Sequence, residues 1–278
     1  MRIFRRVQPG DGSFPTQTSV FPLRTRRIAV LNQKGGCGKT TTTVNLSACL
    51  AERGMRVLVV DVDPQGHATL GFGYRADEIP MTLYHALKPN GPALSRVLQP
   101  TYHINLKLVP ANTSLASLQV ELVDQPDRER VLSEKLSQLS SQFNFVFLDC
   151  PPSLNLLTVN ALVAATDVLI PLQTHYLSLD GMRELFKTID LIREKLNPSL
   201  EILGILPTLF DHRTRMNRAM LSTIREYFKG KVFETIIHTS SALSECPMMG
   251  QPITQYAPQT RGSRDYQQLA QELLALHD

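Results

Sequence analysis

The chain has 278 residues, of which 42% are hydrophobic and 19% are charged, and its formal net charge is +4 at pH 7. This composition can bury a full core, and the length suits a single α/β sheet with helices on both faces. No apolar run approaches the roughly 18–20 residues that a membrane-spanning helix needs, so a membrane protein is not expected.

The cysteines indicate the redox environment. No Cys-x-x-Cys pair occurs among the four, which are Cys37, Cys49, Cys150 and Cys246. Because no signal peptide precedes them either, we expect free thiols in a reduced, cytoplasmic protein. The same pattern argues against an iron–sulfur cluster.

Positive charge is concentrated in two parts of the chain. Residues 1–27 contain six arginines and one acidic residue, a net charge of +5, and residues 210–265 contain eight basic and five acidic residues, a net charge of +3. Two basic regions on a near-neutral body suggest a polyanionic partner, with nucleic acid as the first candidate. Ordinary solvated surface charge is the alternative interpretation.

The first 25 residues differ in character from the rest. They mix Arg, Pro, Gly, Ser and Thr without a sustained period, and we expect them to be a mobile basic arm. The arm is rich in Arg and poor in acids, like an organellar transit peptide, but no amphipathic helix fits before Pro9. Residues 26–278 are expected to form one folded domain.

From residue 26 onward, short apolar runs alternate with helical patterns. Strands are expected at residues 28–31, 57–60, 104–109, 143–148, 167–172 and 202–206. Helices are expected at residues 42–53, 83–87, 93–98, 128–139, 177–196 and 263–276. This alternation predicts a doubly wound, mainly parallel α/β sheet with helices on both faces, which binds ligands at the carboxyl ends of its strands.

A glycine-rich loop lies between the first expected strand and the first expected helix. It reads Asn-Gln-Lys-Gly-Gly-Cys-Gly-Lys-Thr-Thr over residues 32–41. Glycines let the backbone curl so that successive N–H groups point inward at a phosphate, and the helix adds its positive end. Lys39 would reach the β- and γ-phosphates, and the Thr40 hydroxyl would bind Mg²⁺. The expected nucleotide-binding residues are Lys34, Gly35, Gly36, Cys37, Gly38, Lys39, Thr40 and Thr41.

Carboxylates follow two other expected strands. Asp149 ends an apolar strand and fits the acid that holds Mg²⁺, most simply through a water. Asp61 and Asp63 stand two residues apart after the strand at 57–60, so their side chains point in opposite directions if the strand continues. An Asp-Pro turn is the structural alternative for this second segment.

The loop departs from the strict phosphate-loop pattern, because Gln33 stands where a glycine is expected and Lys34 adds a second lysine. This run resembles the deviant Walker A motif of the ParA/MinD family of P-loop ATPases. The resemblance covers roughly residues 26–276 and is closest to the chromosome-type, Soj-like partition ATPases. Further matching stretches are Asp61-Val-Asp-Pro-Gln-Gly66, Asp149-Cys-Pro-Pro-Ser153, Leu206-Pro-Thr-Leu-Phe-Asp211, Leu243-Ser-Glu-Cys-Pro247 and Gly250-Gln-Pro-Ile253.

The resemblance implies a cycle of ATP binding and hydrolysis with ATP and Mg²⁺ as cofactors. Lys39 is the loop lysine, Asp63 orients or deprotonates the attacking water, and Asp61 lies nearer the metal with Thr40 and Asp149. Lys34 crosses a dimer interface to the partner's nucleotide, so that the ATP-bound homodimer and the ADP-bound monomer are two states. Hydrolysis is slow and is stimulated by a ParB-like centromere-binding protein.

The DNA contacts of this family match only in part. Arg213 is kept, beside Arg215 and Arg218 at the start of an expected helix, but Thr239 and Ala242 replace two family arginines. Two functions stay open. The first is a partition ATPase that binds double-stranded DNA without sequence preference and associates with the nucleoid. The second is a positioning or regulatory ATPase that acts on a protein cargo with weak or no DNA binding.

The final expected helix bears on membrane binding. It lacks the basic residues of a MinD-type membrane anchor, so we expect no membrane partner. Its apolar face should instead pack on the core, through Tyr266, Leu269, Ala270, Leu273 and Leu274.

Overall fold

The computed structural model describes residues 25–175 and 181–276, and the expected arm lies outside this part except for Thr25. Within it, seven strands form one sheet in the order β3-β4-β2-β5-β1-β6-β7. The strands are β1 (Arg26–Val30), β2 (Val57–Asp61), β3 (Gln99–Pro100), β4 (Leu106–Val109), β5 (Phe145–Asp149), β6 (Asp167–Gln173) and β7 (Glu201–Thr208).

All neighbouring strands are parallel except β3 and β4, which pair antiparallel at one edge. The predicted doubly wound, mainly parallel sheet is therefore confirmed. The three loops singled out from the sequence follow β1, β2 and β5, and these strands are adjacent in the order β2-β5-β1. Their carboxyl ends consequently meet at one edge of the sheet, where such folds bind ligands.

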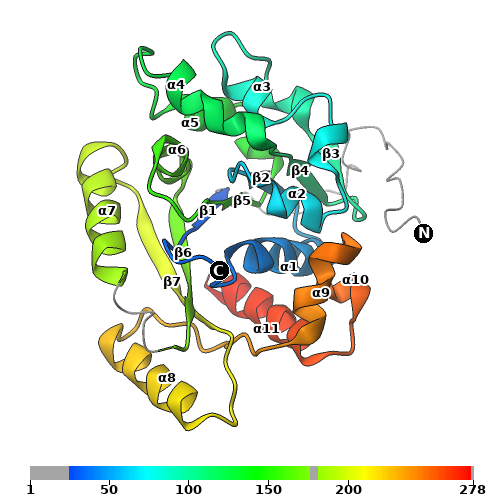
Figure 1. Ribbon diagram of the computed structural model, residues 1–278, viewed down its shortest axis with the longest axis vertical. Coiled ribbons are helices and arrows are strands. Elements are labelled where there is room, and N and C mark those ends of the chain that lie inside the picture. The colour runs from blue at the N-terminus through cyan, green and yellow to red at the C-terminus, as the bar shows by residue number, and fades with distance from the viewer. Residues whose placement is uncertain (1–24, 176–180, 277–278) are drawn as a thin grey trace.

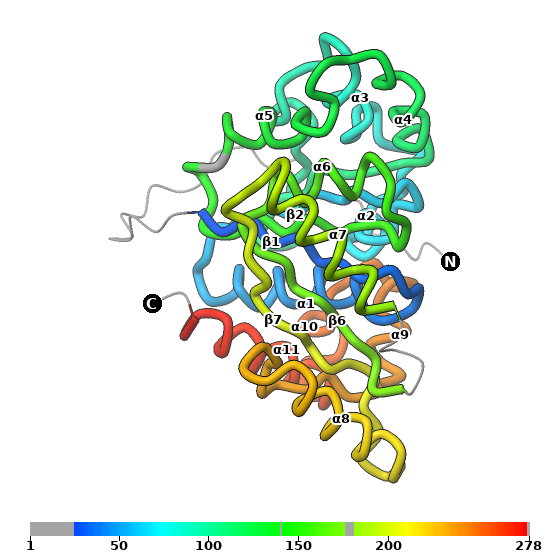
Figure 2. The backbone as a smooth tube through the Cα atoms, turned by 90° about the vertical axis from the view of Figure 1, so that its left-hand side faces the viewer, coloured from blue at the N-terminus to red at the C-terminus, as the bar shows by residue number. Residues whose placement is uncertain are grey.

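Helices cover both faces of the sheet (Figure 1). They are α1 (Lys39–Glu52), α2 (His67–Gly71), α3 (Leu83–Leu87), α4 (Leu118–Glu121), α5 (Val131–Ser137), α6 (Leu156–Ala164), α7 (Met182–Lys195), α8 (Arg215–Tyr227), α9 (Ser241–Met249), α10 (Ile253–Tyr256) and α11 (Arg261–Ala275). Two views agree that α3, α4 and α5 gather at one end of the molecule and α8 and α11 at the other (Figures 1 and 2).

Each face of the sheet has its own apolar core, because alternate side chains of a strand point to opposite faces. In and just after β1, Ala29 and Leu31 pack with residues of α3 to α8, whereas Ile28 and Val30 pack with residues of α1, α2 and α9 to α11. These side chains are completely buried. The continuous apolar runs of the strands follow from this burial on both sides.

The element boundaries differ from the predictions mainly at helix starts. The helix expected from residue 42 begins at Lys39. The residue before it, Gly38, has a left-handed backbone with φ 91°, so the helix starts directly after the glycine loop. The pattern expected as a helix at 93–98 is a short 3-10 turn, Leu94–Val97. Of the helix expected at 177–196, the described part is α7, and residues 177–180 lie outside it.

The final helix agrees with its predicted role. Tyr266, Leu269, Ala270 and Leu273 of α11 are buried in the core that also contains α1, and Leu274 packs against it in part. Among the described residues, no helix is both long and apolar enough to cross a bilayer.

Candidate functional site

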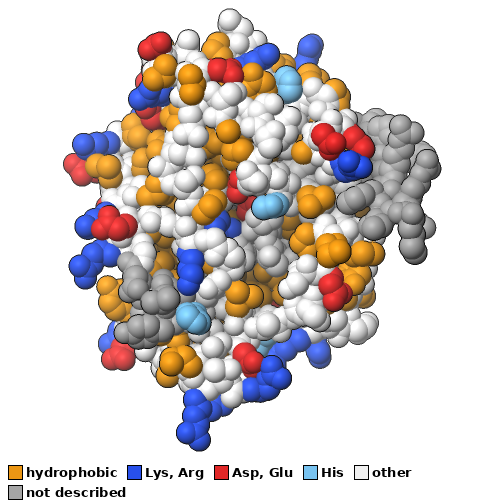
Figure 3. All heavy atoms as spheres, in the orientation of Figure 1, with side chains coloured by type: hydrophobic (Ala, Val, Ile, Leu, Met, Phe, Trp, Pro, Cys, Tyr) orange, Lys and Arg blue, Asp and Glu red, His pale blue; other side chains and the backbone are white. Residues whose placement is uncertain are grey.

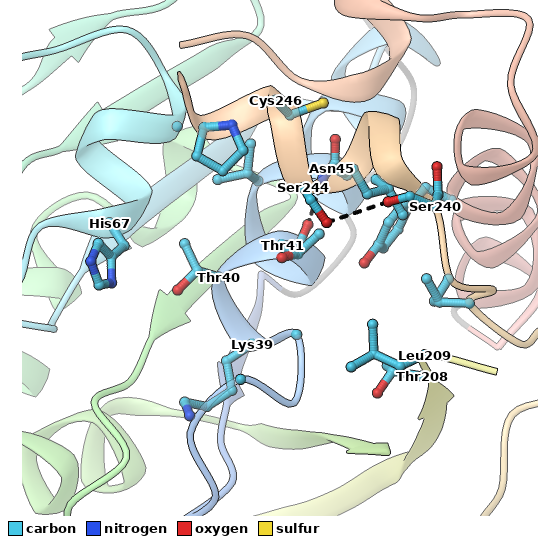
Figure 4. Close-up of a pocket in the computed structure, with 18 of the residues that line it drawn as sticks. Lys39, Thr40, Thr41, Asn45, His67, Thr208, Leu209, Ser240, Ser244 and Cys246 are labelled. Carbon is cyan, nitrogen blue, oxygen red and sulfur yellow. Dashed lines mark hydrogen bonds between the residues drawn. The ribbon is translucent and has the colours of Figure 1, made fainter. Parts of the chain in front are cut away.

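A cavity of about 640 Å³ opens at the carboxyl edge of the sheet. The loop after β1 and the first turns of α1 form one wall, and α9 forms the opposite one (Figure 4). In Figure 4, Lys39 and Thr40 lie on the α1 side, while Thr208 and Leu209 lie across from them at the end of β7. Six of the eight predicted nucleotide-binding residues line the cavity, namely Gly35, Gly36, Gly38, Lys39, Thr40 and Thr41.

The glycine loop has the geometry of an anion-binding nest. Gly36 and Gly38 have φ values of 70° and 91°, in the left-handed region that other residues rarely adopt. The buried Lys39 folds back so that its Nζ donates to the carbonyl oxygen of Lys34 at 3.1 Å. Amide groups, a helix start and an ammonium group therefore converge on one space, which suits a phosphate group.

The predicted metal-binding residues Thr40 and Asp149 are brought together. The Thr40 hydroxyl donates to one carboxylate oxygen of Asp149 at 2.8 Å, and the Thr43 hydroxyl donates to the other at 2.9 Å. Asp149 is completely buried, and this burial raises its pKa, although the two hydroxyl groups oppose the rise. Hydroxyl and carboxylate oxygens beside a phosphate nest are the donors that Mg²⁺ prefers, so these residues fit the metal.

Asp61 was predicted to bind the metal together with Thr40 and Asp149, but its carboxylate oxygens are occupied by hydrogen bonds. One of its oxygens accepts hydrogen bonds from the Thr69 backbone N–H and hydroxyl at 2.8 and 2.7 Å, and the other accepts from the Asp63 N–H at 3.2 Å. Burial, followed by the nearby charge of Asp149, raises the pKa of Asp61. In this arrangement Asp61 anchors the loop after β2 to α2, and a metal role for it stays a prediction.

Asp63 lines the cavity, as its predicted role beside the phosphates requires. Its Oδ1 accepts a hydrogen bond from the Gln65 N–H at 3.0 Å, so the segment also forms the tight turn that was the structural alternative. The turn and the role are compatible, because the second carboxylate oxygen makes no hydrogen bond within the described residues.

Several residues that line the cavity were missed as site residues by sequence reasoning. Asn45 of α1 bridges two segments, since its amide donates to the Thr41 carbonyl at 2.7 Å and its oxygen accepts from the Ile253 N–H. The other missed residues come from the end of β7, from the segment before α9 and from α9 itself: Thr208, Leu209, His238, Ser240, Ser244 and Cys246. Thr208, Leu209, Ser244 and Cys246 lie in two stretches that matched the family pattern, residues 206–211 and 243–247. No role at the site was assigned to them, because only tertiary folding brings these stretches to the cavity.

The predicted DNA-contact arginines lie apart from the cavity, around the start of α8. All three are exposed, and basic side chains gather there at the lower end of the face in Figure 3. The Arg213 guanidinium pairs with Asp211 at 2.8 Å, and Arg218 donates to the His212 carbonyl at 2.8 Å. Arg215 is the first residue of the helix.

The two positions where family arginines are missing face elsewhere. Thr239 lines the cavity, and Ala242, in α9, packs against the core. Neither position therefore contributes charge to the surface around α8.

Because the nest, its lysine and the Thr40–Asp149 pair all meet at the edge of a parallel sheet, the chain is a P-loop ATPase. A family model described as "AAA domain" matches residues 25–202. The chain is 46% identical to the chromosome partitioning protein ParA of Myxococcus xanthus, over 90% of this chain and 88% of that protein. It is 42% identical to the sporulation initiation inhibitor protein Soj of Bacillus subtilis, over 89% of this chain and 98% of that protein. This protein belongs to the ParA/MinD family and is a Soj-like partition ATPase.

Solved structures agree with this assignment. The chain superposes with a TM-score of 0.81 on cobyrinic acid a,c-diamide synthase from Mycobacterium smegmatis with a bound ATP analog and magnesium, at 36% identity over 90% of this chain and 94% of that one. The cell division ATPase MinD of Pyrococcus furiosus gives a TM-score of 0.74 at 25% identity, over 90% of this chain and 99% of that one.

Proposed function

We propose that this protein is an ATP-driven switch for DNA partition. In the proposed cycle ATP binding joins two chains, the dimer binds double-stranded DNA without sequence preference, and hydrolysis stimulated by a ParB-like partner resets the monomer. The names of the ParA and Soj relatives support partition as the process. The cycle would keep the protein associated with the nucleoid while ATP is bound.

Each residue of the site has a part in hydrolysis. Lys39 and the loop amides hold the phosphates, and Thr40 and Asp149 hold the metal. The chemistry that Mg²⁺ supplies when bound is neutralisation of phosphate charge as the bond to the leaving group breaks. Asp63 orients the attacking water and accepts its proton, because it is the carboxylate that lines the cavity with an oxygen to spare.

The state of Lys34 is the observation that carries the proposed dimer. Its backbone is fixed on both sides, since its N–H donates to Asn32 Oδ1 at 3.0 Å and its carbonyl accepts from Lys39. Its half-buried side chain, in contrast, makes no hydrogen bond or ion pair with any residue in the described ranges. A lysine of the phosphate loop whose side chain has no partner among the described residues of its own chain is available to the nucleotide of a second chain.

The arginines around α8 supply the proposed DNA surface. Arg213, Arg215 and Arg218 are exposed at the start of a helix, whose positive end adds to their charge. Contacts of this kind go to phosphate oxygens, so they position the protein without reading sequence.

A second function stays possible for one specific reason. Thr239 and Ala242 stand at positions where the family has arginines, and Arg213 is paired with Asp211. An ATPase that positions a protein cargo, with weak or no DNA binding, would account for this loss of charge.

The deciding experiment measures DNA binding with ATP, with ADP and without nucleotide, each at a low and a high salt concentration. The partition function predicts binding that requires ATP and weakens steeply with salt. Equal or absent binding in all three nucleotide states, in a protein that still hydrolyses ATP, would favour the cargo-positioning function instead.

A further inference from the structure

Two residues outside the glycine loop hold its backbone. The Gln173 side-chain amide donates to the Gly36 carbonyl at 2.7 Å, and the Thr208 hydroxyl donates to the Cys37 carbonyl at 2.8 Å. The two donors are the last residues of β6 and β7 and are opposite each other in the register of these strands. Two neighbouring strands thus hold two consecutive carbonyl groups.

The direction of these carbonyls fixes the direction of the amides that follow. In a trans peptide the C=O of one residue and the N–H of the next are coplanar and point in opposite directions. Because the Gly36 and Cys37 carbonyls point to Gln173 and Thr208, the N–H groups of Cys37 and Gly38 point away from these two side chains. These are amides of the nest that a phosphate group would contact.

We infer that Gln173 and Thr208 are positioning residues for ATP binding, which aim the Cys37 and Gly38 amides at the phosphates. Glycines make such a loop flexible, so the inward direction of its amides has to be imposed from outside. Thr208 is rigidly placed for this, since it is only 1% exposed and its methyl side lies 3.8 Å from where a Cβ of Gly38 would be.

One of these strands, β6, also holds the start of the loop. The Asn32 amide donates to the Pro171 carbonyl of β6 at 2.7 Å, while Asn32 Oδ1 accepts from the Lys34 N–H. The loop is therefore fastened to β6 and β7 at its beginning and at its tightest part. The edge of the sheet, and not the loop sequence alone, then sets the shape of the phosphate site.

The test compares variants by their affinity for MgADP, which requires neither a dimer nor DNA. Thr208→Val keeps the shape of the side chain and removes the hydroxyl, and we expect affinity to fall roughly tenfold, the effect of one buried hydrogen bond. Thr208→Ser keeps the hydroxyl and should bind nearly as the wild type does. Gln173→Met, at a partly exposed position, should also weaken binding even if Thr208→Val does not fold.

Thr235→Val is the matched control. Thr235 is a buried threonine that does not line the cavity, and its hydroxyl has no hydrogen-bond partner in the part of the chain that the structure describes. The same substitution there should leave MgADP affinity unchanged.

NMR distinguishes a change in the direction of these two amides from a general loss of structure in the loop. In the wild type, MgADP should shift the amide proton resonances of Cys37 and Gly38, and Thr208→Val should reduce the shift at Gly38 most. The inference is overturned if Thr208→Ser binds as weakly as Thr208→Val, or if Gln173→Met binds like the wild type.

Discussion

At the scale of single residues, we expect nucleotide binding to depend most on Lys39. Its buried ammonium faces the phosphate nest and donates to the Lys34 carbonyl. We expect Lys39→Ala to lose binding of ATP, because the charge of the β- and γ-phosphates would be left without a partner. Equilibrium binding of a fluorescent ATP analogue measures this. Normal binding and hydrolysis by the folded variant would contradict the assignment of the loop.

Variants of Lys34 and Asp63 should separate the two steps of the proposed cycle, dimerisation and hydrolysis. Asp63→Ala should bind ATP and accumulate as a dimer, because only the group that orients the water is removed. Lys34→Ala should bind ATP and stay monomeric, because the contact across the interface is lost. Light scattering with ATP gives the masses, and ADP serves as the control in each case. A monomeric Asp63→Ala protein with intact ATP binding would remove Asp63 from its role.

The buried carboxylates predict how stability depends on pH. Burial raises the pKa of both Asp149 and Asp61. A carboxyl group whose pKa is higher in the folded state holds more protons there, so the free energy of unfolding falls as pH rises from about 4, the ordinary pKa of Asp. We therefore expect these two groups to lower the thermal stability of the nucleotide-free protein between about pH 4 and the raised pKa values, about 6 for Asp149 and about 8 for Asp61.

The control for this pH dependence is MgADP. A bound cation favours the ionised form of Asp149, so the loss of stability with pH should be smaller when MgADP is present. Melting temperatures measured with a chelator and with MgADP over the same pH range test this. A gain from MgADP that does not change with pH would contradict the prediction.

At the scale of elements, α6 shows how a cap positions the segment after Asp149. Asn155 precedes the helix, and its side-chain oxygen accepts hydrogen bonds from the N–H groups of Leu157 and Thr158. This is the usual N-cap arrangement, which satisfies amides at the start of a helix that have no partner within it. The start of α6, which sequence analysis did not delimit, is thus readable from Asn155 and the apolar residues that follow.

Loss of this cap has a predictable cost. We expect Asn155→Ala to lower the free energy of unfolding by about 1 kcal/mol, as measured by urea denaturation. Asn155→Asp keeps an acceptor and adds a charge that the positive end of the helix favours, so it should retain the stability. Equal stability of the Ala and wild-type proteins would mean that the helix start is held by its packing instead.

At the scale of the whole molecule, the distribution of charge determines the predicted behaviour toward DNA. Replacing Arg215 by Ala should lower affinity for all sequences alike and reduce the slope of log affinity against log salt by roughly one. Arg213→Ala and Arg218→Ala should do the same. Filter binding or fluorescence anisotropy with ATP at several salt concentrations gives these slopes, and Lys187→Ala, on the exposed side of α7, is a charge-matched control.

The basic arm is the competing source of DNA affinity, because its charge is present in every nucleotide state. Deletion of residues 1–24 separates the two sources. If this truncation abolishes binding while the three arginine variants keep it, the surface around α8 is not the one that ATP controls.

Much of the fold and of the phosphate site could be predicted from the sequence. The apolar runs identified six of the strands because burial on both faces requires them, and the sheet rule then placed three loops at one edge. Lys39 and Thr40 could be singled out because the loop consists of ten successive residues, and the structure places Thr40 beside Asp149, while the roles of these residues stay predictions. Asp149 followed because it directly ends a buried strand.

Only the tertiary structure decided which distant residues complete the site. Gln173 and Thr208 hold carbonyls that lie 137 and 171 residues earlier in the chain, and α9 lines the cavity from a segment to which the sequence assigned no role at the site. The structure also shows that both carboxylate oxygens of Asp61 accept hydrogen bonds, one from Asp63 and the other from Thr69. A local pattern specifies the groups that a backbone can arrange by itself, whereas contacts between the ends of separate strands depend on register and packing, which no short stretch of sequence contains.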